Sequence, residues 1–288
     1  MLLMKKYCSP LLKPLLAGVA AAAASAAAVR ALVVEPTHVE VTSHPLALPD
    51  LPAEWEGARV VHLTDIHYGD PRSEQLFRWM VHTVNELAPD LILSTGDFIY
   101  ERRGEVEPCV RYISQLRSKR GMVAVLGDHD YDVRTKRPMK GLCEALEEAG
   151  FRLLRNERVV LPGGLRLAGI DPITHKVQQG DLDAALGDAS EPVPHLLLAH
   201  SPDIILEAAE RGVPMVLCGH THGGQVVLPF YGPPITHARM GRKYASGWSS
   251  LDGTRMYTGR GLASHYSLRF LCRPELTLFT LERREERE

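Results

Sequence analysis

The chain has 288 residues, with 33 basic and 35 acidic side chains, so its formal net charge at pH 7 is −2. This length is enough for one large domain or two small ones, and the near balance of charge argues against a nucleic-acid partner. Five widely spaced cysteines without a CxxC pair argue against a disulfide framework or a structural zinc site. The unusual feature is histidine, which occurs thirteen times.

The N-terminus differs in composition from the rest of the chain. Lys5, Lys6 and Lys13 precede the apolar run PLLAGVAAAAASAAAV, which ends before Arg30. A basic segment followed by an apolar one rich in small residues is typical of a signal peptide or an N-terminal membrane anchor, although an alanine-rich soluble helix remains an alternative. We therefore expect residues 1–34 to lie outside the fold and to direct the domain out of the cytoplasm, with cleavage left open.

Beyond residue 35, strand-like runs alternate with amphipathic stretches. THVEVTSHPLAL predicts an edge strand. The runs ARVVHLTD, DLILSTGD and GMVAVLGD predict buried strands, and helices are expected over 73–88, near 105–119 and over 139–150. This alternation predicts an α/β fold.

From residue 151 the pattern changes to short strands. A Pro-Gly-Gly turn at 162–164 predicts a hairpin, and a helix is expected near 203–211. Further strands are expected in HLLLAH, PMVLCGH, QVVLP, TRMYTGRGL and ELTLFTLE. Without an internal repeat or a second boundary, we predict a single catalytic domain over 35–282, built on two sheets, and a charged tail over 283–288.

Each strong polar cluster follows directly on an apolar run. The clusters are Asp65 with His67, Asp97, Asp128 with His129, His200, and His220 with His222. Open α/β sheets place their sites beyond the carboxyl ends of strands, so these side chains are expected to meet. Mixed carboxylates and imidazoles suit Mn, Fe or Zn better than calcium. About seven such ligands overfill one site but suit two divalent metal ions about 3.5 to 4 Å apart that share a carboxylate.

These residues carry a resemblance to a known family. TDIHYG, STGDF, LGDHDY, LLLAHSPD and CGHTHGGQ resemble, in order, the five blocks of the calcineurin-like metallophosphoesterase superfamily over roughly residues 58–226. The longer sequences around these blocks, together with the late RPELTLFTL, are similar to those of a bacterial subgroup of membrane-associated metallophosphoesterases. The resemblance implies a two-sheet β-sandwich flanked by helices, with a dinuclear metal site at the carboxyl ends of the strands.

The resemblance also assigns roles to residues. It gives one ion to Asp65, His67 and His222, the other to Asp128, His200 and His220, and makes Asp97 the bridge between them. His129 is implied as a catalytic residue that faces the substrate, stabilises its charge and donates a proton to the leaving oxygen. Two ions of this kind would generate a hydroxide that attacks phosphorus in line, without a covalent enzyme intermediate.

Two positions near His129 raise questions. Where the family pattern has Asn, this chain has Asp128, which keeps the ligand oxygen and adds a charge. We expect that charge to hold the second ion more tightly and to attract an anionic phosphate less. Asp130 either orients His129, as outer-sphere carboxylates do, or braces its loop.

His237, His265 and Arg102 are candidates for binding the substrate, with solvated loop positions as the alternative.

The expected function is hydrolysis of a phosphodiester or pyrophosphate bond on an envelope or lipid-linked substrate, by a protein attached to the membrane or exported. One alternative is a UDP-2,3-diacylglucosamine pyrophosphate hydrolase of lipid A synthesis, which would require attachment at the cytoplasmic face. Another is a non-catalytic module that binds metal or phosphate. A nucleic-acid phosphodiesterase is disfavoured because the chain lacks a basic patch with interleaved aromatic residues.

Overall fold

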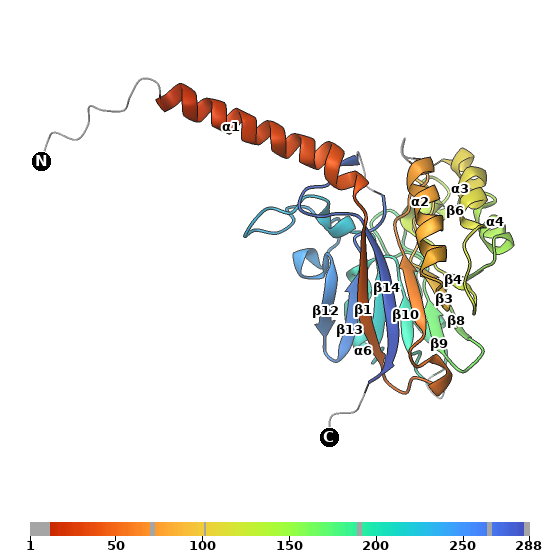
Figure 1. Cartoon of the computed structure of the whole chain (residues 1–288). Helices are drawn as coiled ribbons and strands as arrows, with labels where there is room; N and C mark the ends of the chain where they lie inside the picture. Colours follow the sequence, from red (N-terminus) through yellow and green to blue (C-terminus); the bar gives the residue numbers. More distant parts are fainter. Residues whose placement is uncertain (1–11, 70–72, 101, 189–191, 264–266, 285–288) are drawn as a thin grey trace, which may run out of the picture.

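The computed structural model describes residues 12–69, 73–100, 102–188, 192–263 and 267–284. Two six-stranded sheets pack face to face, and helices cover the outer face of each (Figure 1). A two-stranded ribbon, β5 (Tyr131–Asp132) with β6 (Arg137–Pro138), stands apart from both. The predicted α/β fold with two sheets is confirmed.

The first sheet contains the strands that the first half of the sequence predicts. Its order is β1 (Glu40–Leu48), β14 (Glu275–Arg283), β2 (Arg59–Leu63), β3 (Leu91–Ser94), β4 (Met122–Ala124) and β7 (Phe151–Leu153). From β2 to β7 the strands are parallel, so β2, β3 and β4 end at the same edge. β1 is an edge strand, as predicted, and pairs in parallel with β14.

The second sheet is built from the second half of the chain. Its order is β12 (Gly247–Leu251), β13 (Thr254–Thr258), β11 (Met215–Cys218), β10 (Leu196–Leu198), β9 (Arg166–Gly169) and β8 (Glu157–Val160). The four central strands are parallel, and the two edge strands are antiparallel to their neighbours. The predicted hairpin at 162–164 connects β8 and β9.

Three apolar clusters hold the layers together. One lies between the two sheets, where Val60 of β2 and Leu198 of β10 are buried. Another packs the first sheet against α2 (Ser73–Glu86), α3 (Val106–Ile113) and α4 (Leu142–Glu148). The last packs the second sheet against α5 (Leu182–Leu186) and α6 (Ile205–Glu210). The parallel strands are continuous apolar runs, because both of their faces are buried against another layer.

Three local predictions differ from the structure. QVVLP is not a strand: Val226 and Leu228 form only isolated bridges, and the prolines that follow lack the N–H groups that a ladder needs. α3 ends at Ile113 rather than near 119, and the chain continues in i→i+3 turns. α4 begins at Leu142 because Gly141 has a left-handed backbone, with φ 82°.

Shorter helical turns connect the main elements. These are η2 (Glu35–Thr37), η3 (Ala53–Trp55), η4 (Arg103–Glu105), η5 (Asp128–Asp130), η6 (Pro202–Ile204), η7 (His222–Gly224) and η8 (Gly241–Tyr244). Two of them, η5 and η7, contain residues that the sequence predicts as metal ligands.

An apolar helix projects from the domain at the N-terminal end (Figure 1). α1 (Leu12–Val29) continues through a π-helical turn, η1 (Arg30–Val34). Within the described residues, the stretch Pro14–Thr37 is long and apolar enough to cross a membrane, a property that signal sequences share. Its end is tied to the domain, because Arg269 N donates to Ala31 O at 2.9 Å and Cys272 N donates to the buried Glu35 carboxylate at 3.1 Å.

Candidate metal centre

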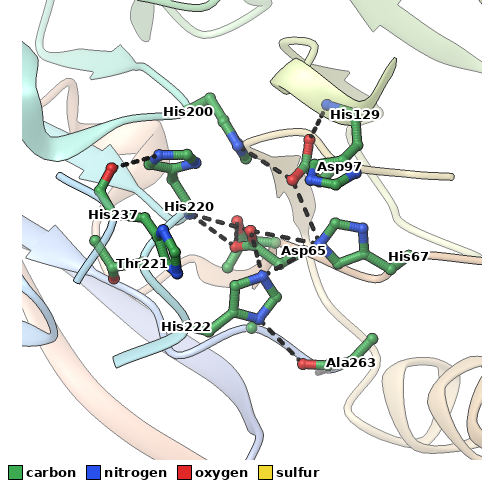
Figure 2. Close-up of polar contacts among 12 residues, drawn as sticks. Asp65, His67, Asp97, His129, His200, His220, Thr221, His222, His237 and Ala263 are labelled. Atoms are coloured by element: carbon green, nitrogen blue, oxygen red, sulfur yellow. Dashed lines mark hydrogen bonds and ion pairs between the residues drawn. The ribbon is translucent and has the colours of Figure 1, made fainter. Parts of the chain in front are cut away.

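Seven buried aspartate and histidine side chains meet where strands of both sheets end. Figure 2 labels each of them except Asp128. The loops that carry them follow β2, β3, β4, β10 and β11. The first triad is Asp65, His67 and His222, the second triad is Asp128, His200 and His220, and Asp97 lies close to both. The structure thus brings together all seven residues that the sequence singled out.

The backbone is unusual at this cluster. Five of its residues have left-handed φ angles: Asp65 (50°), His67 (41°), Asp97 (58°), His220 (70°) and His222 (51°). Residues with a β-carbon adopt this conformation rarely, and it concentrates at functional sites where the surrounding structure enforces it. The sharp turns direct side chains from separate loops toward one centre.

Glycines allow these loops to approach each other. A β-carbon at Gly127 would clash with Asp97 Oδ1, and one at Gly219 would clash with Asp65 Oδ2. Side chains are therefore excluded at both positions by the neighbouring carboxylates.

The first triad is held together by short contacts between ring nitrogens and a carboxylate. His222 Nε2 lies 3.4 Å from Asp65 Oδ1 and 3.2 Å from His67 Nε2. His67 Nε2 lies 4.0 Å from Asp65 Oδ1. The other ring nitrogen of His222, Nδ1, faces Ala263 O at 3.2 Å and the Arg269 guanidinium at 3.4 Å, so Nε2 is the nitrogen directed at the cluster.

The second triad has the same construction. Asp128 Oδ1 lies 3.2 Å from His200 Nε2 and 3.0 Å from His220 Nδ1. Each imidazole uses its other nitrogen on a backbone carbonyl: His200 Nδ1 on Thr95 O at 2.8 Å and His220 Nε2 on His237 O at 3.2 Å. The nitrogen that faces Asp128 is therefore the one available to a ligand.

Asp97 lies between the two triads. Its Oδ2 is 3.3 Å from His67 Nε2 and 3.3 Å from His200 Nε2. Its Oδ1 accepts a hydrogen bond from His129 N at 2.9 Å, which fixes the orientation of the carboxylate. One carboxylate oxygen is thus equally close to a histidine of each triad.

The electrostatics of the cluster favour a bound cation. Burial opposes the charged form of His200, but the carboxylates of Asp97 and Asp128 raise its pKa well above the ordinary value. Burial likewise opposes ionisation of Asp128, but His200 and His220 hold the pKa of its carboxyl well below the usual range. Carboxylate oxygens and imidazole lone pairs that face one another are stabilised by a positive charge between them, and this donor set fits divalent transition ions.

His129 contacts a residue that the sequence did not single out. Its Nδ1 lies 2.5 Å from Tyr100 O, and its Nε2 lies 2.6 Å from Lys176 Nζ. The same ammonium lies 3.3 Å from Asp128 Oδ2. Lys176 therefore belongs to the cluster, but it stands in a loop after β9 with no motif or periodic pattern around it that could have identified it.

Asp130 is wholly buried and binds backbone rather than His129. Its carboxylate accepts N–H groups from Gly127 (2.8 Å), Asp97 (2.9 Å), Phe98 (2.8 Å) and Ile99 (3.3 Å). It thereby ties the loop after β3 to the loop after β4. This arrangement corresponds to the bracing alternative and not to the orientation of the His129 ring.

Arg269 is a second residue that the sequence did not indicate. It is wholly buried, and its guanidinium donates to His222 O at 2.8 Å and Arg260 O at 2.8 Å. It also contacts Ala263 O. Arg269 therefore fixes the loop of the first triad against the segment before β14.

The candidate substrate-binding residues differ in their surroundings. His237 lies at the edge of the cluster, where its backbone carbonyl faces His220 (Figure 2). The pKa of its ring is lowered, mainly by partial burial and also by the charge of the neighbouring His220. Arg102 is exposed, and its backbone N–H donates to Glu105 Oε2 at 2.9 Å. His265 lies outside the described residues.

Comparison with known proteins places this cluster in a family. The sequence model of the calcineurin-like phosphoesterase family matches residues 58–224, the segment that carries all seven clustered residues. The chain belongs to the calcineurin-like phosphoesterase family. It is accordingly a hydrolase of the metallophosphoesterase class, a class that uses divalent metals.

Three relatives cover nearly the whole chain. The uncharacterized metallophosphoesterase YkuE of Bacillus subtilis is 33% identical over 262 residues, which are 88% of each chain. The phosphodiesterase YaeI of Escherichia coli is 31% identical, over 86% of this chain and 90% of that one. The UDP-2,3-diacylglucosamine pyrophosphatase LpxG of Chlamydia trachomatis is 26% identical, over 85% of this chain and 90% of that one.

Proposed function

We propose that this calcineurin-like phosphoesterase hydrolyses a phosphodiester or pyrophosphate bond with two divalent ions held by the two triads. The position of Asp97 is the main support, because its Oδ2 is 3.3 Å from a histidine of each triad. A carboxylate so placed can be shared between two ions. When bound, such ions supply Lewis-acid activation of water and neutralise charge on the phosphoryl group. The donor set suits Mn, Fe or Zn.

The protein's own groups then have separate tasks. The outward nitrogens of His200, His220 and His222 face backbone carbonyls, so the inward nitrogens are the ones that would bind the ions. Asp130 holds the loops of Asp97 and Asp128 in register. His129 is oriented by donation from Nδ1 to Tyr100 O, and its Nε2 lies 2.6 Å from the Lys176 ammonium, which is a donor. The pair would bring positive charge to a phosphoryl oxygen, and a proton that passes through His129 to the leaving oxygen would come from Lys176.

A lipid-linked substrate is the class that we favour. An apolar helix long enough to cross a membrane precedes the domain, and the relative from Chlamydia trachomatis is named for a diacylated sugar nucleotide. A pocket of about 290 Å³ lies beside the first triad, with Val39, Leu76, Trp79 and Leu262 in its walls. Ala263 also lines the pocket and contacts His222, so an acyl chain held there would be near the metal centre.

We further propose that residues 1–34 attach the protein to the membrane or export it, with the domain of residues 35–282 outside the cytoplasm. The basic residues before the apolar run support this orientation. UDP-2,3-diacylglucosamine is the alternative substrate and would place the domain at the cytoplasmic face. A fusion of residues 1–34 to a reporter that is active only outside the cytoplasm separates the two, because activity supports export and its absence from a membrane-bound fusion supports the alternative.

Turnover by the purified full-length protein tests the catalytic proposal. With saturating Mn, we expect hydrolysis of bis(p-nitrophenyl) phosphate or of UDP-2,3-diacylglucosamine, slower hydrolysis of p-nitrophenyl phosphate, and a metal content near two ions per chain. His195→Gln is a matched control, because this histidine binds Asp50 O and Arg166 N outside the cluster. A metal content that stays at one ion under saturating Mn would refute the dinuclear site.

A further inference from the structure

The loop of residues 226–243 exposes a concentration of large apolar side chains. Phe230 is fully exposed, and Tyr231, Ile235 and Leu228 are 57%, 61% and 41% exposed. Single exposed apolar residues are ordinary on a protein surface, but a contiguous exposed group marks a binding surface. Four such residues lie within eight positions of one loop, so this loop is a candidate binding surface.

The same loop is basic. Arg239, Arg242 and Lys243 are exposed, and the sequence contains no acidic residue from Arg211 to Leu251. The Arg242 guanidinium stacks over the Tyr231 ring at 4.2 Å and donates to Tyr231 O at 2.8 Å. Aromatic and basic groups are thus held side by side, as in segments that lie at the interface of a bilayer with anionic lipids.

The loop also starts beside the end of the apolar helix. Val227 N donates to Phe270 O at 2.9 Å, and the neighbouring Arg269 N donates to Ala31 O at 2.9 Å. Figure 1 shows the loop, drawn in cyan, projecting from the same end of the domain as α1. A membrane crossed by α1 would therefore lie close to the exposed tip.

We propose that the 226–243 loop binds the lipid surface, with Phe230 and Tyr231 in the headgroup region and the basic residues at lipid phosphates. This inference rests on the proposed membrane attachment. The loop leaves the metal centre after His222 and passes it again at His237, whose carbonyl faces His220 at 3.2 Å. A tip inserted in the bilayer would therefore hold the metal centre at headgroup level, where a lipid-linked phosphate is found.

Site-specific labelling of the full-length protein in vesicles tests the loop directly. An environment-sensitive fluorophore is attached to Phe230→Cys in a background with Cys8 and Cys143 replaced by serine, and quenching by lipids with spin labels near the headgroup is measured. Val160→Cys is the matched control, because Val160 is 64% exposed but lies on β8. On vesicles with phosphatidylglycerol we expect quenching at position 230 to exceed that at position 160 several-fold, and Arg242→Gln with Lys243→Gln to reduce it.

Equal quenching at the two positions would overturn the inference. So would a blue-shifted emission at position 230 that persists without lipid, since that outcome indicates a protein partner or a second copy of the chain. Hydrolysis of soluble bis(p-nitrophenyl) phosphate by the same samples separates the two proposals. Hydrolysis without quenching rejects the loop and keeps the proposed function, whereas quenching without hydrolysis of any substrate rejects the function and keeps the loop.

Discussion

Replacing Asp128 by Asn should lower the affinity of the second triad for its ion, and replacing Lys176 by Met should raise it. Asp128 presents Oδ1 to His200 and His220 and Oδ2 to Lys176. The charges of Asp128 and Lys176 therefore nearly cancel. The pair has a net charge close to zero, like the neutral Asn that the family pattern has at position 128. Asp128→Asn removes a negative charge and keeps an oxygen, whereas Lys176→Met removes a positive charge and keeps every ligand.

The size of the effect follows from the distance. Two unit charges 3.3 Å apart attract by about 5 kcal/mol at an effective dielectric constant of about 20. Lys176 is 26% exposed, and solvation offsets part of this, so a net coupling of about 1 to 3 kcal/mol is expected. Because about 1.4 kcal/mol corresponds to tenfold, each single substitution should change the second dissociation constant by roughly 5- to 150-fold, in opposite directions. The double variant should bind the second ion more tightly than Asp128→Asn and more weakly than Lys176→Met, because it loses one charge of each sign.

Calorimetric titration of metal-free full-length protein with Mn measures both binding steps. Asp128→Ala is the control that removes the ligand oxygen, and its second step should be lost together with several orders of magnitude in rate. At saturating Mn, Asp128→Asn should hydrolyse a diester within about tenfold of the parent rate. Charge compensation is refuted if the double variant binds as weakly as Asp128→Asn alone. If Asp128→Asn is as inactive as Asp128→Ala with both ions bound, Asp128 transfers a proton instead.

Three further substitutions test the cluster and its supports. Asp97→Ala should lose most of both ions, measured by elemental analysis, and retention of one full equivalent would contradict a shared carboxylate. Asp130→Ala should lower the free energy of unfolding by about 2 to 4 kcal/mol in urea, because it leaves four buried N–H groups unpaired; an unchanged denaturation midpoint would exclude bracing. Burial lowers the pKa of His62 from 6.5 to about 4, opposed by the charge of Glu275. Its stabilising contribution is therefore complete above pH 6.5 and falls by up to about 3 kcal/mol toward pH 4, so His62→Gln should show a weaker acid dependence, and identical dependences would show that His62 is not responsible.

Much of the fold could be predicted because its strands are buried on both faces. ARVVHLTD, DLILSTGD and GMVAVLGD are apolar without alternation, as parallel strands under helices are, and each ends in Asp. Since parallel strands end at one edge, the meeting of Asp65, Asp97 and Asp128 follows from the pattern before any distance is known.

Other features depend on contacts that the sequence does not encode locally. Lys176 reaches His129 across 47 positions, and nothing in its neighbourhood distinguishes it from a solvated lysine. The carboxylate of Asp130 accepts hydrogen bonds from backbone N–H groups 31 to 33 positions away. From the sequence alone, this role cannot be distinguished from an interaction with the adjacent His129. QVVLP has the composition of a strand, but Phe270 provides only an isolated bridge to Val226, so the segment becomes the base of an exposed loop.

The metal centre combines left-handed backbone, neighbouring carboxylates and buried lone pairs. Each of these raises the free energy of the folded state unless other interactions compensate for it. The loops after β3, β4 and β11 cannot relax individually, because buried side chains tie them to other segments. Asp130 ties the Asp97 loop to the Asp128 loop, and Arg269 ties the His222 loop to the segment before β14 and, through its backbone, to the end of the apolar helix. The strain is therefore carried by the packed layers, whose burial does not depend on the ions. We therefore expect the geometry of the centre to be set before a cation binds, so that binding energy would go into holding the proposed ions rather than into ordering the loops.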